Sequence, residues 1–292
     1  MRSSSNTGSS ERTIDRPQTQ KHQRHPGRCP NALFIIGIGP GDADHMSPRA
    51  HTVLREAESI AGYTTYIDLI RPMIQGKKII STGMKKEVDR VSAAIGLAKA
   101  GESCALVSSG DPGIYAMAGL ALEICAKQDI HVMPIASFSE GAGAPADLYV
   151  EVVPGIPALC SGAALLGAPL THDFAAISLS DLLTPWETIE RRLAAAASAD
   201  FVIVLYNPKS KKRRDQLVRA QEIILRHRDG GTPVGIVSSA MRQAQKVEIT
   251  TLDRLHGADV TMLTTVFIGS TASVTYKDFM FTPRGYGAKY EL

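Results

Sequence analysis

Cysteine is scarce in this chain and occurs in no pattern that predicts a metal site. The four cysteines, Cys29, Cys104, Cys125 and Cys160, form no C-x-x-C pair and have no histidine-rich stretch beside them, which argues against a zinc or iron–sulfur centre. Cys104 and Cys125 lie within apolar segments, where cysteine acts as a small buried hydrophobic residue in a reducing compartment. We therefore expect no metal site and a cytoplasmic location.

Long hydrophobic runs are also missing. No stretch approaches the roughly 20 uncharged apolar residues that a membrane-spanning helix needs, so we expect a soluble protein with no membrane partner. The first 30 residues are polar and hold six of the 32 lysines and arginines but only two of the 29 acidic residues. We interpret residues 1–31 as a disordered basic tail and not as a signal peptide.

The rest of the chain has no excess of positive charge. Residues 31–292 contain 26 lysines and arginines and 27 acidic residues. A non-catalytic nucleic-acid-binding protein that uses the tail and the cationic cluster 209–214 is one alternative. The nearly neutral body and the lack of aromatic residues between those cations argue against it, so we expect no nucleic-acid partner.

The run Cys104–Tyr115, CALVSSGDPGIY, predicts a buried strand that ends in an exposed loop. Its first residues are apolar and partly β-branched, whereas Ser109, Gly110, Asp111 and Pro112 cannot continue a strand. Apolar residues then recur at helical spacing from Ile114 onward. In open α/β sheets, ligands bind in such loops between the carboxyl end of a strand and the start of a helix. An ordinary turn with two glycines is the alternative for this motif taken alone.

A second strand runs into a glycine-rich turn at residues 33–42, LFIIGIGPGD. Gly37, Gly39 and Gly41 alternate, a spacing that allows close approach of the backbone to a ligand. A dinucleotide site would need G-x-G-x-x-G at the start of a helix, and here Pro40 and Asp42 interrupt that pattern. The turn contains an acidic residue and no lysine, which favours a ligand without phosphates.

Strands, loops and helices alternate along the whole chain, which predicts an α/β protein of two consecutive domains. We place an N-terminal α/β domain at 32–153 and a C-terminal α/β domain at 154–292. Residues 136–149 are rich in glycine, alanine and proline and predict an inserted surface loop. The cations from Lys209 to Arg214 are expected to open a helix, where they oppose its dipole, so a polyanionic ligand or a solvated face must account for them.

Four ordered motifs give the chain a family resemblance: GIGPGD, SSGDPGIY, VVPGIPA at 152–158 and LYNPKSKKR at 205–213. Together they resemble the tetrapyrrole methylases of cobalamin synthesis over residues 33–286. Three runs, SSGDPGIYAMAGL, HDFAAISLSDLLTPWE and TPRGY, resemble the branch of that family that methylates precorrin-3B at C17 and contracts the ring. The resemblance implies two α/β domains with S-adenosylmethionine in the cleft between them, and S-adenosylhomocysteine as the product. The implied cofactor-binding residues are Gly37, Gly39, Pro40, Gly110, Asp111, Ile114, Pro157, Ala158 and Tyr206. Pro157 stands where relatives often have serine or threonine, so a hydroxyl contact is lost there.

The implied acceptor is precorrin-3B or its cobalt form, a macrocycle with many carboxylates. Cations on loops at strand ends suit it electrostatically, and the candidates are Lys85, Lys86, Lys209, Lys211 and Arg213. Ring contraction also requires proton transfers, for which Asp111, His172 and Asp173 are the titratable candidates. A structural role for His172 and a loop-holding role for Asp111 remain open.

Two alternatives accompany this prediction. A sibling enzyme that methylates another tetrapyrrole carbon would share every cofactor motif, and only product analysis separates the two. The nucleic-acid-binding protein described above is the other. A homodimer is expected from the family.

Overall fold

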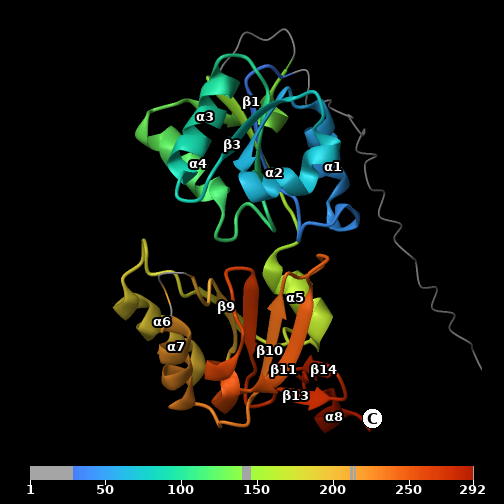
Figure 1. Ribbon diagram of the computed structural model, residues 1–292, viewed down its shortest axis with the longest axis vertical. Coiled ribbons are helices and arrows are strands. Elements are labelled where there is room, and N and C mark those ends of the chain that lie inside the picture. The colour runs from blue at the N-terminus through green and yellow to red at the C-terminus, as the bar shows by residue number, and fades with distance from the viewer. Residues whose placement is uncertain (1–28, 140–145, 211–212, 214, 292) are drawn as a thin grey trace, which may run out of the picture.

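The computed structural model describes residues 29–139, 146–210, 213 and 215–291. The chain forms two α/β units stacked along the long axis of the molecule, and the second begins where α5 leaves the first (Figure 1). Within the described residues, no helix combines the length and hydrophobicity that crossing a bilayer requires. The predicted tail falls mostly on residues 1–28, which lie outside the described part of the chain.

The first unit contains a six-stranded sheet in which all strands are parallel, in the order β3-β2-β4-β1-β6-β5. All six residues of β1 are buried, as the near-continuous apolar run of a central parallel strand requires. The strands are β1 Ala32–Gly37, β2 Ser59–Tyr63, β3 Lys78–Thr82, β4 Cys104–Ser108, β5 Val132–Pro134 and β6 Leu148–Val153.

Four helices cover the two faces of this sheet: α1 Pro48–Glu56, α2 Thr64–Ile70, α3 Glu87–Lys99 and α4 Met117–Lys127. Because side chains alternate along a strand, Phe34 and Ile36 of β1 pack toward α1 and α2, whereas Leu33 and Ile35 pack toward α3 and α4. The result is a three-layer unit (Figure 1). The Ser47 hydroxyl accepts a hydrogen bond from the Ala50 amide at 3.2 Å and caps α1, as Ser-Pro at a helix start favours.

The second unit contains a mixed five-stranded sheet in the order β11-β10-β12-β9-β8. Only β8 and β9 are parallel; the other pairs are antiparallel. Helices α6 and α7 pack on one face and α5 on the other. The elements are α5 Ala158–Leu166, β8 Phe174–Ser178, α6 Trp186–Ser198, β9 Val202–Tyr206, α7 Gln216–Leu225, β10 Pro233–Ser238, β11 Lys246–Thr251 and β12 Thr264–Ile268.

A small third sheet, in the order β13-β14-β7, lies beside α5. It is formed by β7 Gly167–Ala168, β13 Val274–Tyr276 and β14 Phe279–Phe281, and α8 Tyr286–Lys289 follows. Met280 of β14 is fully buried in the cluster that holds α5 against the main sheet. These short elements have no periodic signal in the sequence, and neither α8 nor this sheet was predicted.

The predicted α/β class is confirmed, but some local predictions are wrong. Helix α7 begins at Gln216, so the cations 209–214 precede it and do not form its first turn. Of the predicted loop 136–149, Leu148 and Tyr149 belong to β6, and residues 140–145 lie outside the described residues.

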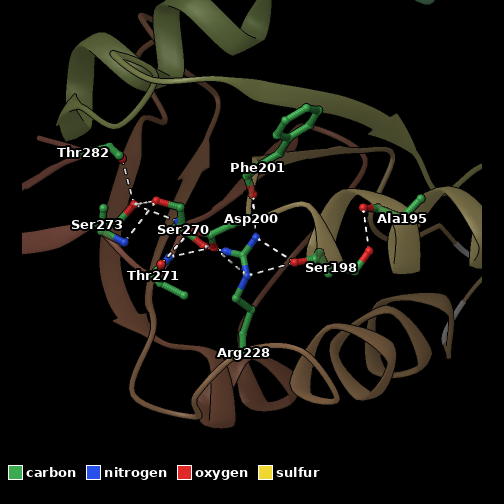
Figure 2. Close-up of polar contacts among 12 residues, drawn as sticks. Ala195, Ser198, Asp200, Phe201, Arg228, Ser270, Thr271, Ser273 and Thr282 are labelled. Atoms are coloured by element: carbon green, nitrogen blue, oxygen red, sulfur yellow. Dashed lines mark hydrogen bonds and ion pairs between the residues drawn. The ribbon is translucent and has the colours of Figure 1, made fainter. Parts of the chain in front are cut away.

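One end of the second sheet is held by a buried arginine, Arg228 (Figure 2). Its guanidinium donates to the carbonyls of Ala197, Phe201 and Gly269, and its Nε lies 3.2 Å from Oδ1 of Asp200. Asp200 also accepts from the amide and hydroxyl of Thr271. Arg228 thereby ties together the end of α6, the start of β9 and the end of β12. Chain direction places this cluster at the end of the sheet opposite Tyr206.

Candidate active site between the two units

The two glycine-rich loops of the first unit are joined to each other through their backbones. The Gly39 amide donates to the Gly110 carbonyl at 3.1 Å, and the Gly110 amide donates to the Gly39 carbonyl at 2.7 Å. Gly37 lies beneath this pair: a Cβ on Gly37 would overlap the Gly110 carbonyl and come within 2.8 Å of Cδ of Pro112. Main-chain atoms therefore pack here at distances that only glycine permits.

Asp111 fixes the second loop with both of its carboxylate oxygens. Oδ1 accepts from the Gly113 amide at 2.8 Å, within the loop itself. Oδ2 accepts from the Gly155 amide at 3.2 Å, in the segment that leads into the second unit. This geometry supports the loop-holding role, since both oxygens are already engaged by backbone donors.

A cavity of about 220 Å³ lies between the two units. The first unit contributes the loop after β1, side chains of α2 and α3 and the loop after β4. The second contributes the start of α5 and the loops at the cleft ends of β9, β10 and β12. The lining includes Pro40, Tyr66, Arg90, Ser108, Ser109, Gly110, Asp111, Ile114, Tyr115, Met117, Pro157, Ala158, Ser161, Tyr206, Asn207, Arg242, Met262 and Thr265.

Tyr206, at the end of β9, forms part of the wall on the second unit. Its hydroxyl accepts a hydrogen bond from the Leu159 amide at 2.9 Å, one of the free donors in the first turn of α5. Its ring lies 5.0 Å from that of Tyr115, between centroids, and the Tyr115 hydroxyl donates to the Ala176 carbonyl of β8. Burial raises the pKa of Tyr206 to about 12, so it is a neutral phenol at physiological pH and not a base.

The residues present fit a donor such as S-adenosylmethionine, which combines a nucleoside with an amino acid. The cavity offers backbone polar groups on two loops and apolar surface from Ile114, Pro157 and Ala158, the mixture typical of small-molecule sites. Ser108 supplies a further indication: its Oγ is buried and has no hydrogen-bond partner among the described residues. A buried hydroxyl left in that state is costly, and a ligand in the cavity can satisfy it.

The structure brings together most of the predicted cofactor-binding residues. Those that line the cavity are Pro40, Gly110, Asp111, Ile114, Pro157, Ala158 and Tyr206. Gly37 and Gly39 are not part of the lining; they support the loops from behind through the contacts described above. Their part is to allow close packing, so a direct contact with the cofactor is not required of them.

Two of the three predicted catalytic residues lie elsewhere. Strands β8 and β9 are parallel, with Ser178 opposite Tyr206 and Phe174 opposite Val202. His172 and Asp173 precede β8, and the Asp173 carbonyl accepts from the Val202 amide, so they lie a full strand length from the cleft. Their side chains are 54% and 80% exposed. Because catalytic loops follow the carboxyl ends of strands, we do not retain them as candidates.

Of the predicted substrate-binding cations, those that the structure describes do not line the cavity either. Lys85 and Lys86 are exposed, and Lys86 pairs with Asp89 at 3.0 Å. Lys209 is exposed, and Lys211 lies outside the described residues. Arg213 comes nearest: it donates to the Ser180 hydroxyl and touches Sδ of Met262, a cavity residue.

The sequence analysis missed Arg90 and Arg242, which line the cavity together with Tyr66. Arg242 comes from the turn after β10 and donates to the Pro40 carbonyl and, at 2.9 Å, to the Ser109 hydroxyl. It therefore connects the second unit to both loops of the first. Arg242 lies in the turn after the buried strand β10, and that position could have identified it.

Among the described residues, no group of three or more His, Cys, Asp and Glu side chains could hold a metal ion. The cavity is lined by loops and side chains of both α/β units, an arrangement suited to holding two reactants in alignment.

Comparison with known proteins identifies the protein family. The family model of the tetrapyrrole (corrin/porphyrin) methylases matches residues 32–256, and the chain belongs to that family. It is accordingly a methyltransferase that uses S-adenosylmethionine, as predicted.

Two relatives and one solved structure are similar to this chain over most of its length. The chain is 44% identical over 254 residues to the probable cobalt-factor III C(17)-methyltransferase of Salmonella typhimurium, covering 87% of this chain and 99% of that protein. It is 46% identical over 260 residues to the cobalt-factor III methyltransferase of Priestia megaterium, of which it spans only 46%. The crystal structure of the methyltransferase CobJ superimposes with a TM-score of 0.76 at 34% identity, covering 86% of this chain and 99% of that one.

Proposed function

We propose that this protein methylates C17 of precorrin-3B or its cobalt form, with contraction of the ring to the precorrin-4 level, in cobalamin biosynthesis. The observation that carries the proposal is the cavity between the units, lined by the motif residues of both, in a chain that matches a named C17-methyltransferase almost end to end. The relatives are named for the cobalt-containing substrate, which favours the cobalt form.

In this function the donor supplies an activated methyl group, and the chain aligns it with the acceptor carbon. The paired loops at Gly39 and Gly110 form a rigid floor, and Asp111 holds that floor against the segment entering the second unit. Tyr206 orders the start of α5. Alignment of two bound reactants removes much of the entropic barrier to their reaction, so no dedicated acid–base pair is needed for methyl transfer.

The first test is calorimetric titration of the purified full chain with S-adenosylhomocysteine. Micromolar binding supports the proposal, and no binding by a folded sample overturns it. Products formed from cobalt-factor III and from precorrin-3B would then be examined by mass spectrometry and NMR. Methylation at a carbon other than C17 would establish the alternative, a sibling tetrapyrrole methyltransferase.

Three further features belong to this proposal. The chain divides into domains 32–153 and 154–292, because no strand of either range enters a sheet of the other within the described residues. It acts as a homodimer, as expected from the family, which light scattering in solution tests. It works in the cytoplasm, where its thiols stay reduced; the four described cysteines are free.

A further inference from the structure

Two arginines and a tyrosine converge in the cleft from three different elements. Arg90 comes from α3, Tyr66 from α2 and Arg242 from the turn after β10, and all three line the cavity. Both guanidiniums act electrostatically on the Tyr66 hydroxyl. One cation therefore belongs to the first unit and the other to the second, and both act on the same hydroxyl.

These two arginines differ in their partners from Arg49, which is half-buried, and Arg228, which is buried. Arg49 pairs with Glu151 and Arg228 with Asp200. Within the described residues, neither Arg90 nor Arg242 has a carboxylate within ion-pair distance. Arg90 donates to the Thr82 hydroxyl and the Gly83 carbonyl, so its partners are neutral. Burial lowers the pKa of both groups, although Glu87 acts in the opposite direction on Arg90.

The hydrogen-bond inventory leaves donors available. A guanidinium has five N–H groups. Arg242 uses Nε on the Pro40 carbonyl and Nη2 on the Ser109 hydroxyl, and the described residues provide no acceptor for Nη1. Those two bonds hold the plane of the guanidinium in place, so the remaining donors are fixed in direction. A preoriented, partly buried cation without a counter-ion is suited to an anionic group of a ligand.

We propose that Arg242 and Arg90, with the Tyr66 hydroxyl, form a carboxylate-binding subsite of the cleft. The inference rests on the proposed function, in which both ligands carry this group: the donor has one amino-acid carboxylate and the tetrapyrrole has several. If the tetrapyrrole supplies the carboxylate, the subsite takes the part that the sequence analysis gives to Lys85, Lys86, Lys209, Lys211 and Arg213. Arg242 also contacts both glycine-rich loops, so a carboxylate bound there is held by both units.

The test compares Arg242→Gln with wild type on three probes. Affinities for S-adenosylhomocysteine and for 5′-methylthioadenosine, which lacks the carboxylate, are measured by calorimetry. The affinity for cobalt-factor III is measured by absorbance titration. If the acceptor supplies the carboxylate, cobalt-factor III binds roughly 10- to 100-fold more weakly and S-adenosylhomocysteine is unaffected. If the donor supplies the carboxylate, the affinity for S-adenosylhomocysteine falls by a similar factor, while the affinity for 5′-methylthioadenosine does not change.

The controls are Arg242→Lys, which keeps the charge and should recover part of the loss, and Arg55→Gln, whose side chain is 71% exposed in the native protein. If Arg242→Gln fails to fold, Tyr66→Phe serves in its place. It keeps the ring, loses the hydroxyl and should lower the affinity for the same ligand by roughly 2- to 10-fold. Unchanged affinity for all three probes overturns the inference, as does equal weakening of both nucleosides, which would make Arg242 a structural link. Failure of wild type to bind any probe would instead overturn the proposed function.

Discussion

At the scale of single residues, Asp111 shows how a side chain in a ligand cavity can act on the protein and not on the ligand. Its oxygens accept from Gly113 and Gly155, which lie on either side of the junction between the units. A carboxylate accepting two backbone N–H bonds stabilises the loop in one conformation. Asp111 is therefore better described as a positioning residue than as a proton donor.

We expect Asp111→Ala to weaken S-adenosylhomocysteine binding roughly 10-fold, because two backbone donors lose their acceptor and the loop loosens. Calorimetry measures the effect, and circular dichroism should show a folded protein. Asp111→Asn keeps one acceptor oxygen, so its affinity for S-adenosylhomocysteine should fall between those of wild type and Asp111→Ala. Wild-type affinity and turnover in the alanine variant would remove Asp111 from the site.

At the scale of elements, the glycine loops and helix glycines of this chain respond to the same substitution in opposite ways. A Cβ on Gly37 meets main-chain atoms of the facing loops, whereas a Cβ on Gly96, within α3, meets no atom within 4 Å. We expect Gly37→Ala to lower the free energy of unfolding by about 1–3 kcal/mol and to weaken S-adenosylhomocysteine binding. Gly96→Ala should raise the free energy of unfolding by about 0.5–1 kcal/mol.

Urea denaturation of the two glycine variants measures both changes. Equal stability of Gly37→Ala and wild type would show that the facing loops can separate without penalty, and the close packing described above would then have no energetic weight.

Arg228 gives a second prediction at this scale. Its buried guanidinium joins α6, β9 and β12 (Figure 2). Arg228→Met leaves three carbonyls without the guanidinium donor and Asp200 with only its bonds from Thr271, so we expect a loss of about 3–5 kcal/mol in the free energy of unfolding. The matched control is Arg191→Met, an exposed arginine of α6 whose change should stay within about 0.5 kcal/mol.

Because Arg228 lies at the end of the sheet away from the cleft, the folded fraction of Arg228→Met should bind S-adenosylhomocysteine like wild type. A large loss of affinity without loss of stability would contradict this separation of stability from function.

At the scale of the whole molecule, a ligand between the units should stabilise both together. Trp186, the only tryptophan of the sequence, is buried in the second unit, so its fluorescence reports on that unit, whereas far-UV circular dichroism reports on both. With S-adenosylhomocysteine at 100 times its Kd, we expect the free energy of unfolding to rise by about 2.7 kcal/mol in both signals. A shift in circular dichroism alone would place the ligand on the first unit only.

The sequence allowed prediction of the features that depend on local pattern. Apolar runs identified the main strands, and glycine loops after two of them identified the cavity floor, because turn chemistry and strand direction are encoded within a few residues. His172 and Asp173 could have been excluded by the same rule, since they precede β8. The family resemblance supplied Pro157, Ala158 and Tyr206.

The remaining features depend on contacts between distant segments. Arg90 has the position of an ordinary helix cation, and its contacts with Thr82, at the end of β3, and with Gly83 come from a separate element. Arg242 reaches the cleft only because β10 ends opposite the first unit. Arg228 lies just beyond α7, where nothing local indicates that three carbonyls surround it. Long-range packing of this kind leaves no periodic signal in the chain.

The main-chain construction of the cleft floor has a consequence for descent. Because Gly39 and Gly110 hold each other through backbone bonds, gene duplicates can exchange side chains around the rim while inheriting the methyl-donor floor intact. We therefore expect substitutions among the lining side chains to change the choice of acceptor while these backbone bonds persist.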